Sequence, residues 1–299
     1  MNNEWETFPA DLPAIAPRVG PFVQRPFLEA VWRNRSDQGA ELHIERSDTG
    51  AAAVVVSIGA IEFAGQSDLT DYHAPVGRDG ASALVSALAR FPDMPFRLDS
   101  LPHEAVAPIT EALVEAGFSF IVADHGTAAV IALPDTYEAW LGSLGKKQRH
   151  EVRRKRRKFE AEFGEIEIEH HTGDAIEVFC TMHRLSEGEK GRFMTAPMKD
   201  YFTELLQTAG ASIHFLVCDG VPRAAAFGFE TEDGYYYYNS AYDPGAAMAS
   251  PGVVLFSSMI ETEIDRGAAV FDFLKGDEQY KFRHGAEARP LHVIEGRTS

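Results

Sequence analysis

The chain has 299 residues, of which 45% are hydrophobic and 24% charged, and its formal net charge is −17. This length is enough for about two domains, and the composition is that of a globular protein, which excludes bulk disorder. The segment 146–158 carries a net charge of +8, which leaves −25 for the rest of the chain. That balance argues against general adhesion to nucleic acid or to an anionic membrane.

The sequence shows no charged-apolar-small leader and no apolar run near about 18 residues, so we expect a cytoplasmic protein without a transmembrane segment. Cys180 and Cys218 lack metal-ligand spacing, and His170, His171 and His183 are not arranged with acidic or cysteine partners. We therefore expect no metal. The absence of G-x-S-x-G, P-loop and G-x-G-x-x-G motifs disfavours the common hydrolase, nucleotidase and dehydrogenase classes.

The first half predicts a mixture of strands and helices after a Pro-rich segment at 1–25, in which Phe8 and Phe22 are expected to dock onto the fold. Periodicity and turn residues predict helices at 26–35, 80–90 and 104–116, and strands at 41–46, 51–57, 59–63, 96–99, 118–123 and 128–133. The last two strands are expected to flank a turn at 124–126. Pro134 marks a boundary, which predicts an N-terminal lobe of 1–134 and a C-terminal lobe of 135–299.

In the second half, Asp135 is expected to cap a helix that runs to Leu144, and Gly145 allows a break before a basic helix at 146–163. A strand at 165–170, helices at 174–187 and 197–209, three antiparallel strands at 212–219, 223–231 and 234–242, and a final strand at 289–294 follow.

The stretch 250–285 has the most informative pattern. The turn Ser250-Pro251-Gly252 begins a helix that Gly267 ends, a strand at 269–274 contains Asp272, and a short helix carries Tyr280 and Lys281. A helix whose first turn consists of small residues leaves backbone N–H groups unpaired, which suits a phosphate or pyrophosphate; an ordinary helix start is the alternative. Tyr and Lys are residue types that donate a proton or hold an anion.

The order of elements is repeated between the two halves. In 71–99, a turn after the strands leads to a helix with small residues at its start and then to a strand that contains Asp99. In 242–274, a turn leads in the same way to a helix and then to a strand that contains Asp272. The same supersecondary unit therefore occurs twice in this prediction, with a chance match of common elements as the alternative.

Two further segments have both a functional and a structural interpretation. Arg149 and Arg153 belong to a basic run that could grip an anionic group, or that could be a solvated helix face. The run Tyr235 to Tyr238 is expected to place two rings in the core and two on the other face of a sheet, where they could line a substrate cleft.

Residues 140–159 and 271–281 together resemble bacterial acyltransferases associated with cellulose and polysaccharide biosynthesis (CelD/BcsL-like). These proteins belong to the GNAT superfamily and are related to the Fem-type peptidyltransferases, which carry two GNAT-like domains in one chain. The resemblance implies an α/β fold with a mixed sheet and tandem GNAT-like domains. It also implies an acetyl-CoA or other acyl-CoA donor, a small-molecule, glycan or peptide acceptor with an amine or hydroxyl group, and a role in polysaccharide or cell-envelope metabolism.

The resemblance also implies site residues. The pyrophosphate is expected at Ser250, Pro251, Gly252, Val253 and Val254, although this segment keeps only the last glycine of the usual pattern and Pro251 has no N–H. Tyr280 is expected to protonate the leaving thiolate, and Lys281 to hold donor phosphate. The candidates for the general base are Asp272 and Glu230; for Asp272, a cap or salt bridge is the alternative.

Arg149, Arg153 and Tyr242 are candidate substrate- or phosphate-binding residues. The alternative function is that of a non-catalytic GNAT-like protein that recognises an anionic ligand through its basic helix.

Overall fold

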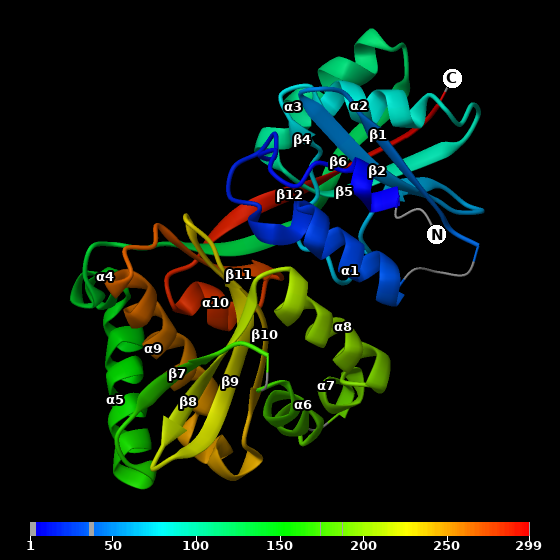
Figure 1. The fold of residues 1–299 in the computed structure, drawn as a ribbon. Coiled ribbons are helices and arrows are strands. Elements are labelled where there is room, and N and C mark those ends of the chain that lie inside the picture. Colours follow the sequence, from blue (N-terminus) through cyan, green and yellow to red (C-terminus); the bar gives the residue numbers. More distant parts are fainter. Residues whose placement is uncertain (1–3, 36–38, 174, 187, 299) are drawn as a thin grey trace. The chain divides into compact units, whose positions relative to one another are not determined.

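The computed structural model describes residues 4–35, 39–173, 175–186 and 188–298 (Figure 1). The chain forms two compact units, one made of Met1–Ala128 with Arg289–Ser299 and the other of Ala129–Ala288. This division differs from the expected one at the end of the chain. Strand β12 (Glu287–Arg297) pairs antiparallel with β5 (Pro95–Pro102), and this long-range pairing gives the last segment to the first unit. No helix in the described part of the chain is long and apolar enough to cross a membrane.

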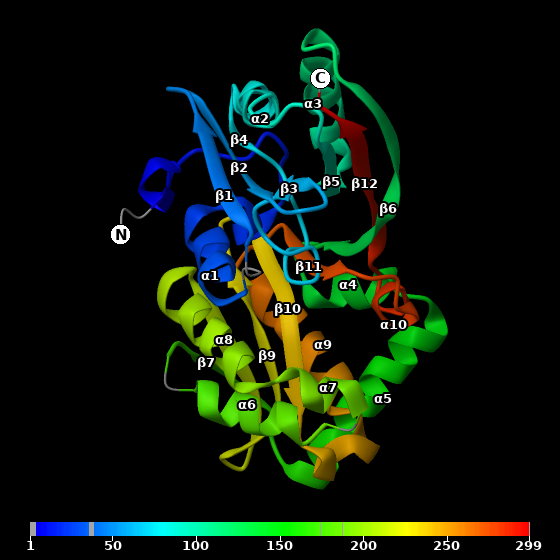
Figure 2. The same ribbon diagram turned by 90° about the vertical axis from the view of Figure 1, so that its right-hand side faces the viewer.

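The first unit is a sheet with strand order β1-β2-β3-β5-β12-β6 and helices packed on it (Figure 2). Its other strands are β1 (Glu41–Arg46), β2 (Gly50–Val56), β3 (Ile61–Phe63), β4 (Val76–Gly77) and β6 (Ser119–Ala132). Its helices are η1 (Glu4–Thr7), η2 (Gly20–Val23), α1 (Arg25–Arg35), α2 (Gly80–Leu88) and α3 (His103–Glu115). Phe8 and Phe22 are buried, which confirms that the Pro-rich segment docks onto the fold. The prediction of a turn at 124–126 is wrong, because β6 continues through these residues. Gly126 adopts a φ of 151° there, which glycine tolerates.

In the second unit, the end of β6 borders a sheet with strand order β11-β10-β9-β8-β7. These strands are β7 (Glu167–His171), β8 (Ala211–Cys218), β9 (Val221–Glu230), β10 (Gly234–Tyr242) and β11 (Val270–Lys275). The helices are α4 (Tyr137–Ser143), α5 (Lys146–Phe163), α6 (Ile176–Arg184), α7 (Gly188–Phe193), α8 (Ala196–Thr208), η3 (Pro244–Ala249), α9 (Pro251–Asp265) and α10 (Gln279–Arg283). Helices α5 and α9 cover one face of this sheet, and α6 and α8 cover the other (Figure 1).

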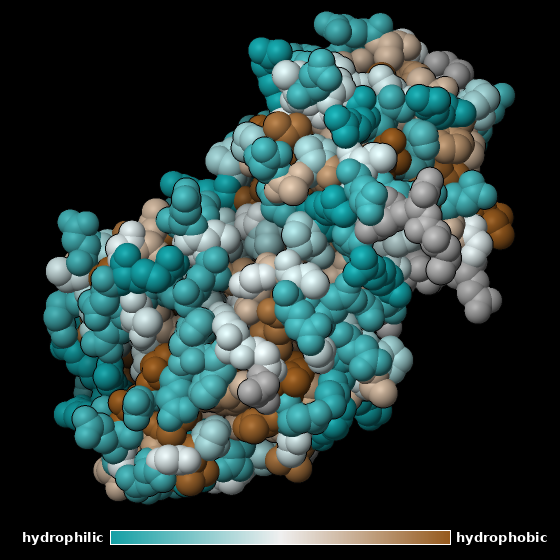
Figure 3. All heavy atoms as spheres, in the orientation of Figure 1, coloured by the Kyte–Doolittle hydropathy of each residue, from teal (hydrophilic) through white to brown (hydrophobic). Residues whose placement is uncertain are grey.

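The tyrosines of β10 alternate between these two faces, as expected. Tyr235 and Tyr237 are buried in the core under α5 and α9. Tyr238 faces α8, where its hydroxyl lies 3.1 Å from that of Tyr201 and its ring packs near Phe202. Hydrophilic side chains predominate on the face of the molecule drawn in Figure 3.

The predicted repeat appears as one parallel strand pair in each unit. β3 pairs parallel with β5 around a connection that contains α2, and β10 pairs parallel with β11 around a connection that contains α9. In each case the second strand carries an aspartate closely followed by a residue with positive φ, Ser100 after Asp99 and Leu274 after Asp272. A parallel pair needs such a crossover, so the two units share one local plan.

Local signals set the ends of two helices in the second unit. The cap of α4 is Thr136, whose hydroxyl accepts a hydrogen bond from the N–H of Ala139 at 3.2 Å, so the expectation that Asp135 caps this helix is wrong. The threonine is one residue closer to the first helical turn, where its oxygen reaches an unpaired N–H. Gly267 follows α9 with a φ of 79°, which confirms it as the glycine that ends this helix.

Candidate functional site

The parallel strands β10 and β11 stay together for only three residue pairs. Pairing runs from Gly234 with Val270 to Tyr236 with Asp272 and then stops, although both strands continue. Just beyond this point β10 has a bulge at Tyr238, because Tyr237 pairs with Gly228 and Asn239 already pairs with Phe227. Separated strands leave backbone N–H and C=O groups on their facing edges, which can pair with an extended ligand that contains amides.

Helix α9 begins with fewer free N–H groups than the sequence suggests. Ser250 precedes it in the left-handed conformation, with a φ of 62°. The N–H groups of Val253 and Val254 both donate to the carbonyl of Ser250, at 3.1 and 3.3 Å, and Pro251 has none. The N–H of Gly252 belongs to the first helical turn, where N–H groups have no acceptor within the helix. A Cβ placed on Gly252 would meet nothing within 4 Å. This helix start is therefore accessible but offers a narrow cradle for a phosphate.

Tyr280 lies against the first half of α9, near the point where the strands separate. Its ring centroid is 6.1 Å from that of Phe256 on α9 and 6.1 Å from that of Phe273 on β11. Burial of the ring, with the nearby charge of Glu278, raises the pKa of Tyr280 to about 12, while the residue remains 41% exposed. The phenol therefore keeps its proton at neutral pH and can reach a ligand, which is what a proton donor requires.

Lys281, expected to hold donor phosphate, instead faces the connection between β11 and α10. Its ammonium donates to the carbonyl of Lys275 at 2.9 Å and is 2.9 Å from the carboxylate of Glu278. Longer contacts reach the carbonyls of Leu274 at 3.4 Å and Gly276 at 3.5 Å. With the residue only 3% exposed, the ammonium holds the backbone that carries Tyr280 rather than an open site.

The two candidate bases occupy different places. Asp272 is buried, and one of its carboxylate oxygens accepts a hydrogen bond from the N–H of Leu274 at 2.7 Å. It alternates with Phe271 and Phe273, so it projects to the sheet face opposite the one that α9 covers. Glu230 ends β9 opposite Tyr235, about 23 Å along β10 from the end that leads to α9. The structure therefore keeps Asp272 in the last pair before the strands separate and places Glu230 far from the start of α9.

The predicted anion-binding residues have partners within the second unit. Arg149 donates to the carbonyl of Gly142 at 3.1 Å, and Arg153 pairs with Glu138 at 2.7 Å. Other basic side chains of α5 are also paired, as in the bidentate contact of Arg154 with Glu151 and the contacts of Arg156 with Glu160 and Glu261. Tyr242, at the end of β10, packs against the core below α9. Helix α5 thus resembles a paired surface helix more than an open anion site.

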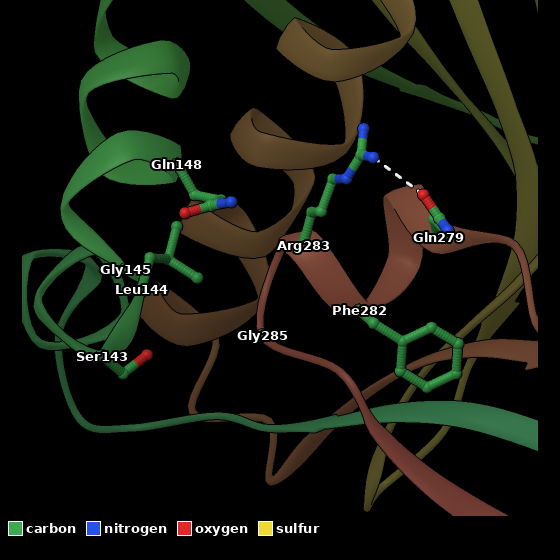
Figure 4. Close-up of a pocket in the computed structure, with 8 residues that line it drawn as sticks. All are labelled: Ser143, Leu144, Gly145, Gln148, Gln279, Phe282, Arg283 and Gly285. Atoms are coloured by element: carbon green, nitrogen blue, oxygen red, sulfur yellow. Dashed lines mark hydrogen bonds between the residues drawn. The ribbon is translucent and has the colours of Figure 1, made fainter.

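A pocket of about 470 Å³ lies between the start of α5 and α10 (Figure 4). Four lining residues lie at or just before the start of α5 and four lie on or just after α10. They are Ser143, Leu144, Gly145 and Gln148, and Gln279, Phe282, Arg283 and Gly285. Gln148 extends toward α10, and the guanidinium of Arg283 donates to the side-chain oxygen of Gln279 at 2.8 Å. The pocket therefore has a polar, partly cationic wall next to the helix that carries Tyr280.

Comparison with known protein families gives a match within the second unit. Residues 146–282 match the family described as an acetyltransferase (GNAT) domain. This match covers most of the second unit, which has a GNAT fold. No significant match is found among the curated proteins.

Solved structures match the chain over nearly its whole length. A conserved protein of unknown function from Bacteroides thetaiotaomicron has a TM-score of 0.65 at 15% identity, with 97% of this chain and 95% of that chain covered. FemX has a TM-score of 0.64 at 11% identity, with 98% and 95% covered. The C-terminal domain (DUF2156) of a protein assigned as a lysylphosphatidylglycerol synthetase of Agrobacterium fabrum has a TM-score of 0.59 at 12% identity, with 90% and 91% covered. At these identities the likeness shows the fold alone. The strand pairing confirms the expected α/β class with a mixed sheet, and the family match confirms the GNAT fold.

Sequence patterns missed several polar residues of the GNAT domain. Gln148, Gln279 and Arg283 meet only because α5 and α10, far apart in the sequence, face one another. His284 is the residue that follows α10, and its ring lies against that of Phe256. Burial lowers the pKa of His284, so the imidazole is neutral at pH 7. His170 was expected to have no acidic partner, yet the pairing of β7 with β8 brings it close to His214 and Glu230. The sequence shows the adjacent histidines at the end of a predicted strand. It does not show the register with which that strand pairs with β8.

Proposed function

We propose that this protein transfers an acyl group from an acyl-CoA, such as acetyl-CoA, to an amine or hydroxyl acceptor. The single observation that supports this most is the early separation of β10 from β11 beside α9 and Tyr280. It provides two strand edges for an extended donor with amide groups, a helix start for its phosphates and a phenol at the same place.

The roles of the residues follow from their positions. An acyl-CoA thioester supplies the activated acyl group, and Gly252, with the accessible start of α9, would hold its phosphate end. Tyr280 donates its proton to the sulfur that leaves, because its pKa of about 12 keeps the phenol protonated. Asp272, on the other face of the strand separation, accepts the proton that the acceptor's nitrogen or oxygen releases. Lys281 positions the segment between β11 and Tyr280.

We extend the proposal to the acceptor from the resemblance to the CelD/BcsL-like acyltransferases, which suggests a glycan, a peptide or another cell-envelope component. The non-catalytic alternative, in which α5 binds an anionic ligand, has less support because Arg153, Arg154 and Arg156 are already paired with carboxylates.

Tyr280→Phe tests the proposal. Thiol release from acetyl-CoA is measured with amino sugars, lysine peptides and other amine or hydroxyl acceptors. The variant should lose about 10²-fold or more in turnover, because it lacks the donated proton, and should keep its donor affinity within about threefold. Equal turnover by the wild-type protein and Tyr280→Phe would refute the role of the phenol. Absence of thiol release with every acceptor, together with absence of donor binding, would refute the function.

A further inference from the structure

Three side chains from neighbouring strands of the GNAT domain converge at the end of the sheet remote from the start of α9. His170 lies on β7, His214 on β8 and Glu230 at the end of β9. Nε2 of His214 is 2.9 Å from Oε1 of Glu230, and Nε2 of His170 is 3.9 Å from the same oxygen. Each of the three residues thus offers one ligand atom, and these three atoms all lie within 4.8 Å of one another.

The sheet register explains this convergence. His170 pairs directly with His214, and His214 reaches Glu230 across the pair formed by Ser212 and Gly228. Gly228 has no side chain to block the path. A Cβ at this glycine would lie 2.4 Å from the hydroxyl of Tyr235, so that hydroxyl lies directly over it. Two imidazoles, a carboxylate and two hydroxyls are therefore gathered on one patch of the sheet.

Several of these polar atoms are buried without a hydrogen-bond partner among the described residues. They are Oγ of Ser212, the hydroxyl of Tyr235 and Nδ1 of His214. Buried polar groups are normally satisfied by protein atoms or by ordered water. A water molecule fixed at this place would offer the hydroxyls the partner they lack.

We propose that His170, His214 and Glu230 bind a divalent transition-metal ion of the zinc class, with water as the fourth ligand. Two imidazole nitrogens and one carboxylate oxygen are a ligand set that Zn²⁺ takes, and a fourth position held by water is common. Ligand atoms about 2.1 Å from a tetrahedral ion lie about 3.4 Å apart. The separations of 2.9 and 3.9 Å bracket this value, and the side chain of His170 is 49% exposed and can adjust.

The charges around the three residues suit a cation. The carboxylate of Glu230 offers a negative charge to the ion, and Nε2 of His214 lies 2.9 Å from one of its oxygens. Arg266, the nearby cation, is bound to the fully buried Glu263 at 2.6 Å, which offsets its charge.

The ion would tie down an edge strand. β7 is the last strand in the sheet order and pairs with β8 over five residues, so it is hydrogen-bonded to the sheet on one side only. A metal bridging β7, β8 and β9 would add a cross-link there. This role goes beyond the proposed acyl transfer and does not depend on it, because the site lies at the end of β10 remote from the start of α9.

The full chain, freed of metal with a chelator, is titrated with Zn²⁺ by calorimetry and with Co²⁺ by visible absorption. We expect one equivalent that gives the intense bands of four-coordinate Co²⁺. His170→Ala and Glu230→Gln should each weaken this equivalent by about tenfold or more. Zn²⁺ should raise the Tm of the wild-type protein but not that of His170→Ala.

His171→Ala is the matched control. His171 is the next residue of β7, is similarly exposed and projects to the other face, against Phe215 and Glu169. This variant should bind the metal like the wild-type protein. No uptake of Zn²⁺ or Co²⁺ by the wild-type protein would overturn the proposal. Equal uptake with unchanged affinity in His170→Ala and Glu230→Gln would overturn it as well. The side chains of His170 and Glu230 are 49% and 31% exposed, so neither variant is expected to unfold.

Discussion

Replacing Lys281 with Met should destabilise the second unit and leave the donor affinity of the folded protein nearly unchanged. The side chain is 4% exposed, and its ammonium holds the carbonyl of Lys275 and the carboxylate of Glu278, each at 2.9 Å, with weaker contacts to two more carbonyls. Methionine has a similar length but no donor. Those backbone oxygens would then lose a charged partner inside the protein.

The size of the effect follows from these contacts. Glu278 is 57% exposed and can be solvated after the change, so the loss comes mainly from the carbonyls. We expect a decrease of about 2–4 kcal/mol in the free energy of unfolding. For a unit of this size that corresponds to a Tm lower by about 5–15 °C.

Thermal and urea unfolding followed by tryptophan fluorescence measures this change, because Trp140 is buried and its indole N–H donates to the carbonyl of His284 at 3.1 Å. Arg283→Met, on the same short helix but exposed, is the control and should cost less than about 1 kcal/mol. If Lys281→Met is as stable as the wild-type protein and binds acetyl-CoA at least tenfold more weakly, the ammonium is a donor ligand and our assignment is wrong.

Two further predictions concern stability. Burial raises the pKa of Asp99, but the hydrogen bond and charge of His73, with the charge of His125, outweigh it and lower the pKa below its usual value. The stabilisation from Asp99 is therefore complete above the unfolded pKa of about 3.9 and is lost as the pH falls through the lower folded value. The first unit of Asp99→Asn should show a shallower loss of unfolding free energy below about pH 4, and an unchanged slope would contradict this. Ser250→Gly should raise the free energy of unfolding of the second unit by about 0.5–1 kcal/mol, because glycine accepts the φ of 62° without strain. Urea unfolding measures this change. A destabilised variant would show that the contacts of the serine side chain outweigh the relief of backbone strain.

Patterns that depend on a few neighbouring residues were predictable from the sequence. Pro251 and Gly267 gave both ends of α9, since proline favours the first turn of a helix and glycine the position after the last. The alternation of Tyr235 and Tyr238 gave the two faces of β10. The Tyr-Lys pair was correctly placed on a short helix after β11.

Features that depend on long-range pairing were not predictable. β12 joins the first unit because it pairs with β5, about 190 residues earlier in the chain, and no local pattern specifies that partner. The direction of Lys281 depends on the path of the backbone at Leu274, whose φ of 62° is unusual for leucine. The approach of His170 to Glu230 depends on strand register and on the glycine between them. These are the features on which the site assignments depend most.

Titration calorimetry with acetyl-CoA and CoA tests the central claim, that the GNAT domain binds an acyl-CoA at the start of α9. The wild-type protein is compared with Gly252→Glu, whose new side chain has open space, and with Ala247→Glu on the preceding turn. A carboxylate near a phosphate should weaken binding by about tenfold or more, and a helix N-terminus tolerates the added negative charge. We predict micromolar binding at one site in the wild-type protein and Ala247→Glu, and its loss in Gly252→Glu. No binding by the wild-type protein, or equal affinity in Gly252→Glu, would contradict the account.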